Sequence, residues 1–166
     1  GSATIQLGAN SSLTLDNVHA AFTQNGQGYR QAFNIGAGSV MTVDNGSVVD
    51  NGAPLYGGGG MILVRGGSTW NNTLGLTGGA INNTMFKVSG IGSAINVKAA
   101  SLTQGDGNSF IAENGGKFSF EDQYYAASYK AFIAAFGADS QVIVTVAKNK
   151  NAGPNTNGAQ IIAADG

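Results

Sequence analysis

The stretch that decides the fold runs from residue 32 to residue 52 and reads AFNIGAGSVMTVDNGSVVDNG. Within it, short apolar-x-apolar segments alternate with corners that contain glycine, and two of these corners carry a Gly-Ser pair. Alternation with a period of two predicts short strands that bury one face. Glycine at the corners permits backbone angles that other residues avoid. We therefore interpret the stretch as strands joined by bends that pass the chain from one sheet to the next.

The same unit recurs along the whole chain. The other copies read ATIQLGANSSLTLDN from residue 3, MILVRGGSTWNN from 61, MFKVSGIGSAINV from 85, SFIAENGGKFSF from 109, AFIAAFGADSQVIVTV from 131 and AQIIAADG from 159. The anchors Ile5, Phe33, Ile62, Phe86, Phe110 and Phe132 recur at roughly 22 to 29 residues, which is the spacing of solenoids and propellers. Four-stranded propeller blades need longer units. We expect an all-β protein, a parallel β-helix of about six rungs.

The repeat also predicts the domain organisation and the core. We expect one β-solenoid domain over residues 1–166, with rungs that start near residues 3, 32, 61, 85, 109 and 131 and a half rung from 159. Each rung can bury its apolar face only against its neighbours. We expect Phe33, Ile62, Phe86, Phe110 and Phe132 to form one stacked column of the core. Aromatic residues at helical spacing allow one short helical turn near residues 122–130.

Composition excludes several classes of function. Charged residues make up 10% of the chain and the net charge is −1, so there is no basic surface that could neutralise phosphates, and no nucleic-acid partner is expected. The absence of cysteine excludes disulfides, thiol catalysis and zinc-thiolate sites. No apolar run reaches the ~18 residues that a transmembrane helix needs. We expect no cofactor.

At the level of this repeat, the chain resembles the passenger domains of bacterial autotransporters and related surface adhesins. The unit AFNIGAGSVMTVDNGSVVDNG carries the resemblance, which extends over nearly the whole chain. It implies a right-handed β-helix, an extracellular or cell-surface location, and a role in adhesion, aggregation or a structural stalk. It supplies no catalytic residues. The expected partner is a second copy of the chain, or a glycan or protein of a cell surface.

Candidate metal-binding and catalytic residues are few. His19 is the single histidine and cannot form a metal site alone. The Asp-Asn-Gly sequences at Asp44 and Asp50 fit either calcium-binding oxygens or a pair of tight turns, and we favour turns because no calcium-loop spacing is present. Phage tailspikes share the fold, and a tailspike-like depolymerase would need paired carboxylates. Asp44 and Glu113 are one such candidate pair, but nothing selects them, and we predict no enzymatic activity.

Aromatic residues outside the predicted columns suggest an alternative function. Exposed aromatic rings beside Asn and Gln are typical of a sugar-binding face, although they also cover the flanks of solenoids. The candidates for glycan contact are Tyr29, Tyr56, Trp70, Tyr124, Tyr125 and Tyr129.

The two ends of the sequence complement each other. The last copy of the repeat, AQIIAADG, lacks a second strand, and the first residues, GSATIQL, read like that missing strand. Either the chain is a segment of a longer stalk, or the head of one subunit completes the tail rung of the next to build a fibre. The predicted assembly interface consists of Thr4, Ile5, Leu7, Gln160, Ile161 and Ile162.

Overall fold

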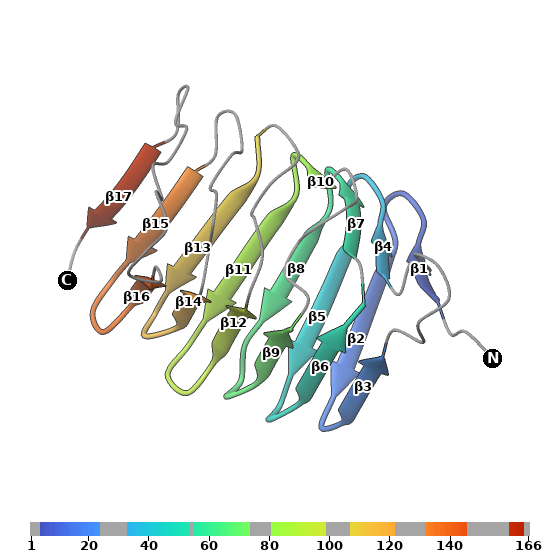
Figure 1. Ribbon diagram of the computed structural model, residues 1–166, viewed down its shortest axis with the longest axis horizontal. Helices are drawn as coiled ribbons and strands as arrows, with labels where there is room; N and C mark the ends of the chain where they lie inside the picture. The colour runs from blue at the N-terminus through green and yellow to red at the C-terminus, as the bar shows by residue number, and fades with distance from the viewer. Residues whose placement is uncertain are drawn as a thin grey trace.

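The fold is a parallel β-solenoid (Figure 1). The computed structural model describes residues 4–23, 33–53, 55–73, 81–98, 107–121, 132–145 and 160–164. Every strand pairing within these ranges is parallel, and no helix occurs in them. The helical turn expected near residues 122–130 lies outside the described residues. The all-β, stacked architecture expected from the repeat is confirmed.

Three sheets enclose the core, and we name them A, B and C in the order in which the chain visits them. Sheet A contains β1 (Ile5–Leu7), β4 (Phe33–Ile35), β7 (Leu55–Gly58) and β10 (Ile81–Asn82). Sheet B contains β2 (Ser12–Asp16), β5 (Val40–Asp44), β8 (Met61–Val64), β11 (Met85–Ser89), β13 (Ser109–Glu113), β15 (Phe132–Phe136) and β17 (Gln160–Ala164). Sheet C contains β3 (His19–Thr23), β6 (Val48–Gly52), β9 (Thr69–Asn72), β12 (Ala94–Lys98), β14 (Lys117–Glu121) and β16 (Gln141–Thr145).

The number of turns depends on which sheet is followed. In the described residues four turns have a strand in all three sheets, from β1–β2–β3 to β10–β11–β12. Sheets B and C continue beyond them with β13 and β14, then β15 and β16, and sheet B ends with β17. The sequence predicted about six rungs of two strands each. It missed the third strand of a turn because the strands of sheet A are only two to four residues long.

The predicted core column mixes two sheets and is corrected by the strand register. Phe33 lies in sheet A, where it is opposite Ile5 and Leu55. Ile62, Phe86 and Phe110 do stack in sheet B, and their column continues to Met41 on one side and Ile133 on the other. Phe132 is opposite Ser109, on the outer face of the sheet. Phe132 and Phe136 stack there on each other, with ring centroids 6.3 Å apart.

The corners explain why glycine, asparagine and serine recur in the sequence. All residues with positive φ in the described ranges lie at or beside corners, including Asn45 (φ 55°) and Gly46 (φ 73°) between sheets B and C. At the same corner, serine hydroxyls accept hydrogen bonds from the preceding turn. The amide of Ser47 donates to Ser68 Oγ over 3.1 Å, and the amide of Gly67 donates to Ser93 Oγ over 3.1 Å. The sequence-based interpretation of Gly-Ser as a sheet-to-sheet bend is confirmed.

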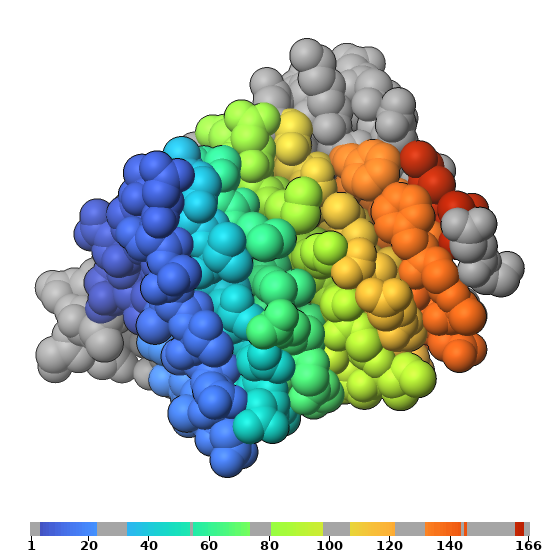
Figure 2. All heavy atoms as spheres, turned by 180° about the vertical axis from the view of Figure 1, so that it is seen from behind, coloured from blue at the N-terminus to red at the C-terminus, as the bar shows by residue number. Residues whose placement is uncertain are grey.

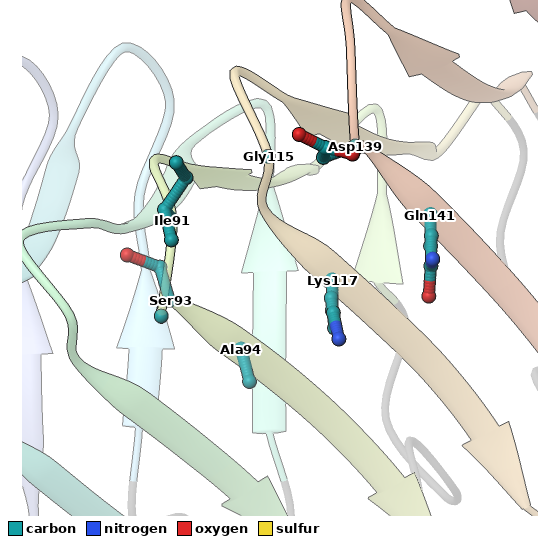
Figure 3. Close-up of a pocket in the computed structure, with 8 residues that line it drawn as sticks. Ile91, Ser93, Ala94, Gly115, Lys117, Asp139 and Gln141 are labelled. Atoms are coloured by element: carbon teal, nitrogen blue, oxygen red, sulfur yellow. The ribbon is translucent and has the colours of Figure 1, made fainter. Parts of the chain in front are cut away.

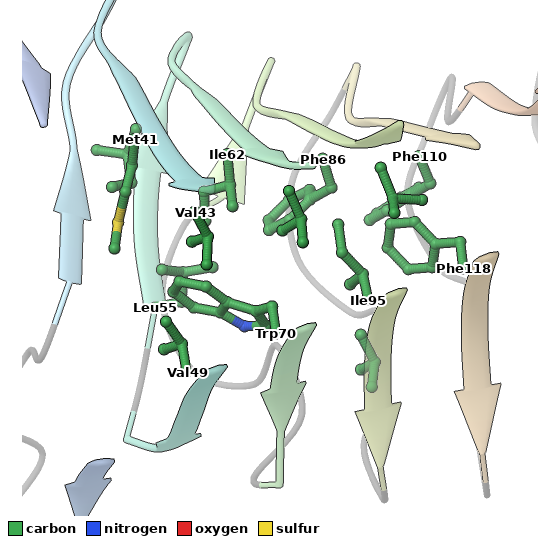
Figure 4. Packing of buried hydrophobic residues seen from close by; sticks show 14 of the residues in the cluster. Met41, Val43, Val49, Leu55, Ile62, Trp70, Phe86, Ile95, Phe110 and Phe118 are labelled. Atoms are coloured by element: carbon green, nitrogen blue, oxygen red, sulfur yellow. The ribbon is translucent and has the colours of Figure 1, made fainter. Parts of the chain in front are cut away.

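Apolar side chains from the three sheets fill the interior (Figure 4). Trp70 packs against Phe33 with ring centroids 5.1 Å apart. In the later turns, Phe86 of β11 stacks on Phe110 of β13 with a centroid distance of 5.4 Å, and within β14 Phe118 stacks on Phe120 at 4.6 Å. Each turn therefore buries its side chains against the next, as the side-by-side bands of successive turns in Figure 2 illustrate. No helix long and apolar enough to cross a membrane occurs in the described ranges.

Candidate assembly surfaces and surface clusters

The C-terminal end of the described stack is open. Sheet B extends one strand further than sheet C, so β17 has a neighbour only in β15, and β16 has one only in β14. A hollow lies between these strands; the residues that line it include Ile133, Ala135, Val142, Ile143, Ile162 and Ala163. The hollow exposes apolar surface next to main-chain groups that have no strand partner among the described residues. Such edges are templates for pairing with another strand.

The N-terminal end presents three edge strands in one turn. In the part of the chain that the structure describes, each of these strands has one neighbour: β1 pairs with β4, β2 with β5 and β3 with β6. Ile5, Leu13, Leu15 and Phe22 are partly buried and pack against the core from this end. These side chains would be covered completely by one more turn of a solenoid.

The residues predicted to form the assembly interface lie at these two ends. Ile5 and Leu7 belong to β1, with Thr4 directly before it, and Gln160, Ile161 and Ile162 belong to β17. The sequence treated the two segments as successive strands of one rung. In the structure β1 lies in sheet A and β17 in sheet B, at opposite ends of the stack (Figure 1). Their pairing stays a prediction, whose geometry is taken up below.

A row of hydrogen-bonded side chains crosses the outer face of sheet C, and we call it the polar ladder. It consists of His19, Asp50, Asn71, Asn96 and Ser119. Ser119 Oγ donates to Asn96 Oδ1 over 2.8 Å, Asn96 Nδ2 to Asn71 Oδ1 over 2.9 Å, and Asn71 Nδ2 to Asp50 Oδ1 over 2.8 Å. His19 Nε2 lies 2.8 Å from Asp50 Oδ2. The donors all point towards Asp50, so its carboxylate orients the amides of the row.

The polar ladder makes a testable prediction about acid stability. Hydrogen bonds from Asn71 and His19 hold the pKa of Asp50 below its ordinary value of 3.8. Because the pKa is lowered by folding, the stability that Asp50 contributes is present above the unfolded pKa and is lost as pH falls through the folded value. We expect Asp50→Asn to lower the Tm at neutral pH and to flatten its fall under acid, measured by circular dichroism from about pH 6 to about pH 2.

Asp16→Asn is the matched control for this prediction. It removes one carboxylate from the exposed end of β2, where no ladder forms. The control should lower the Tm at neutral pH less than Asp50→Asn does. Equal curves for Asp50→Asn and the unmodified protein would show that the ladder contributes nothing to acid stability.

A shallow notch lies at the corner between sheets B and C (Figure 3). The corners that contain Ile91 and Asp139 have one residue more than the corner between them, which consists of Asn114, Gly115 and Gly116. Residues of all three corners line the notch. Ile91 is 81% exposed at the rim. Lys117 and Asp139 also line the notch. The notch therefore combines an apolar rim with one positively and one negatively charged side chain.

The two Asp-Asn-Gly sequences differ in structure. Asp44-Asn45-Gly46 forms a corner, as expected. Asp50-Asn51-Gly52 is not a turn, because it lies within β6. Asn51 is fully buried there, and its Nδ2 donates to Asn72 Oδ1 over 2.6 Å and to the carbonyl of Ala53 over 2.9 Å. Strand alternation can place an asparagine inside, but the sequence offers no signal that separates this asparagine from one in a turn.

The carboxylates do not assemble into a catalytic or metal site in the described part of the chain. Arg65 Nε contacts Asp44 Oδ2 at 2.7 Å, and the same hydrogen bond holds the pKa of Asp44 below its ordinary value. Lys87 Nζ lies 2.9 Å from Glu113 Oε1. Asp44 and Glu113 are on β5 and β13, three strand spacings or about 14 Å apart. That exceeds the separation of a glycosidase pair. No group of three metal-ligating side chains occurs in these ranges.

Two of the six aromatic residues predicted for glycan contact lie in the described residues. Trp70 is not in a loop: it lies in β9, is 2% exposed and packs in the core, so it cannot present its ring to a ligand. Its position two residues after a Gly-Ser pair, which Met41 and Ile95 share, was the signal that could have placed it inside. Tyr56 is half-buried in β7, and Tyr29, Tyr124, Tyr125 and Tyr129 lie outside the described residues.

Comparison with known proteins gives no relatives. No protein-family model matches the chain, and no curated protein or solved structure matches it either.

Proposed function

We propose that the protein is a non-enzymatic structural β-solenoid that extends its stack by pairing end to end with further copies, as a fibre of a cell surface or extracellular matrix. The observation that carries the proposal is the open C-terminal end, where the free edges of β16 and β17 flank an apolar hollow. At the other end, β1, β2 and β3 offer three parallel edges and partly buried core residues.

Physical chemistry favours joining these two ends. Adding a strand to a free edge satisfies main-chain hydrogen bonds, and burying apolar area contributes about 25 cal/mol per Å². Unlike ends that bind each other make a heterologous contact, which generates a linear assembly when it does not close into a ring. With a net charge of −1, the electrostatic repulsion between copies is small. A stalk in which the next turns come from the same chain would use the same edges in the same way.

The location belongs to the proposal as well. The resemblance to autotransporter passengers and adhesins supports an extracellular or surface position, where a repetitive, cysteine-free and weakly charged solenoid serves as a stalk or fibre. No residue of the described ranges is assigned a catalytic role.

Electron microscopy with negative stain tests the proposal directly. The concentrated protein should form long fibres whose width is that of one solenoid, and sedimentation should show a length that grows with concentration. A variant that lacks residues 1–7, and so lacks β1, should remain short. Ile91→Lys is the control, because it changes an exposed apolar residue on the side of the stack rather than at an end.

The outcomes separate the proposal from its alternatives. Fibres from the unmodified protein and from Ile91→Lys, but not from the truncated chain, would support end-to-end assembly. Monomeric rods from all three at every concentration would contradict it. A cooperative thermal transition of the truncated chain is required as a check, so that loss of fibres is not confused with loss of the fold.

A further inference from the structure

The strand count at the two ends restricts how successive copies can join, and this inference rests on the proposed function. Among the described residues, sheet B extends one strand further than sheet C at the C-terminal end. At the N-terminal end, sheets B and C start in the same turn, with β2 and β3. A copy stacked in phase, with β2 on β17, would therefore leave a gap one strand wide between β16 and the β3 of the next copy. Main-chain groups buried beside such a gap would lack partners, which costs free energy at each of them.

A rotation of the next copy removes this gap. The chain visits the sheets in the order A, B, C, so the position that follows β17 in the solenoid is in sheet C. We propose that each copy is rotated about the stack axis by one sheet relative to the copy before it. The β1 strand of the incoming copy then pairs with β16, and its β3 strand pairs with β17. The edges of β16 and β17 are then both paired, and β1 extends sheet C to the level of β17.

The strand lengths fit this joint. β3 and β17 are both five residues long, and β1, with three residues, fits within the five of β16. The joint is defined by the edges of sheets B and C, which end with β17 and β16 among the described residues.

The inward and outward positions also match across the joint. In β3, Ala20 and Phe22 are partly buried and alternate with the exposed Ala21. In β17, Ala163 is opposite Ala135, which is itself opposite the buried Ala112. With the strand centres aligned, Phe22 of the incoming copy lies opposite Ala163. A large residue then meets a small one at this inward position, as close packing of an interior requires.

A pair of engineered disulfides distinguishes the two geometries. The chain has no cysteine, so every disulfide formed is an introduced one. Ile162 is on the outer face of β17 and 38% exposed. In the rotated joint it lies opposite Ala21 of the next copy, and in the in-phase joint it lies opposite Thr14. Neighbouring strands about 4.8 Å apart bring facing Cα atoms within disulfide range.

The test compares Ala21→Cys/Ile162→Cys with Thr14→Cys/Ile162→Cys, two double variants that share one position. Each is oxidised under fibre-forming conditions and run on a non-reducing gel. The first should give a ladder of covalent multimers that disappears with reductant, and the second should remain mostly monomeric. A second rotated pair, Gln6→Cys/Ile143→Cys, joins β1 to β16 and should also give the ladder. Labelling of each single cysteine variant with a maleimide confirms that the positions are accessible.

The results separate failure of this joint from failure of the proposed function. A ladder from the Thr14 pair only would overturn the rotation and leave fibre assembly intact. Fibres in the microscope without a ladder from any pair would likewise overturn the rotated joint. The absence of both fibres and ladders would contradict end-to-end assembly itself.

Discussion

Replacing Phe110 with aspartate is expected to abolish the folded state. Phe110 is 2% exposed, and its ring contacts three others: Phe86 at 5.4 Å, Phe118 at 5.7 Å and Phe120 at 5.4 Å between centroids. Truncating a buried phenylalanine costs about 3–5 kcal/mol. An unpaired carboxylate at this position adds several kcal/mol more. A protein of this size has a total stability of about 5–15 kcal/mol.

Urea unfolding followed by circular dichroism would measure this effect. Ile111→Asp is the matched control, because Ile111 is the next residue of β13 and is half-buried on the outer face of sheet B. The control should unfold cooperatively with a much smaller loss of stability. A soluble Phe110→Asp variant that melts cooperatively would refute the register in which Phe110 faces the interior.

The sequence predicted the architecture because the physical signals for it are local. Alternation in VMTV and in FKV identifies strands, and glycine or asparagine at the bends identifies corners, as the positive φ of Asn45 and Gly46 confirms. The stacked Phe86 and Phe110 follow from the repeat itself. These features depend only on neighbouring residues in the chain.

The errors concern two features that alternation alone does not determine: the sheet to which a strand belongs and the face of the strand that points inward. Phe33 and Phe86 both begin an apolar-x-apolar segment, and alternation cannot tell that one lies in sheet A and the other in sheet B. Phe132 precedes Ile133, and a shift of one residue along a strand exchanges the inner and outer faces. The structure places Ile133 inside.

The polar ladder and the open end illustrate a second limit. Asp50 and Ser119 are 69 positions apart in number, yet they belong to one row because each turn returns a strand to the same sheet. Composition and spacing do not reveal such rows until the register is known. The same holds for the ends: only the sheet assignment shows that β17 and β16 are the outermost strands of their sheets among the described residues.

The corner glycine Gly36 provides the second large expected effect. A Cβ atom at this position would lie 2.7 Å from the carbonyl oxygen of Leu7, 3.1 Å from the carbonyl carbon of Gly8 and 3.2 Å from the amide nitrogen of Ala9. All three atoms are main chain of the preceding turn, so no side-chain rotation can relieve the contact. We expect Gly36→Ala to destabilise the fold by about 1–3 kcal/mol, which lowers the Tm by several degrees.

Gly58→Ala is the control that isolates the steric cause. Gly58 follows Gly57, and Gly57 is opposite Ile35, so Gly58 occupies the position of Gly36 one turn later. A Cβ atom there would meet nothing within 4 Å. Differential scanning calorimetry of the two variants should show a lowered Tm for Gly36→Ala and a nearly unchanged Tm for Gly58→Ala.

Gly36→Ala should also shorten any fibres. Gly36 packs against the corner that follows β1, so the substitution displaces the edge strand on which the joint between copies depends. Equal melting curves for both variants would contradict the steric explanation, because they would show that a Cβ atom at residue 36 fits between the first two turns.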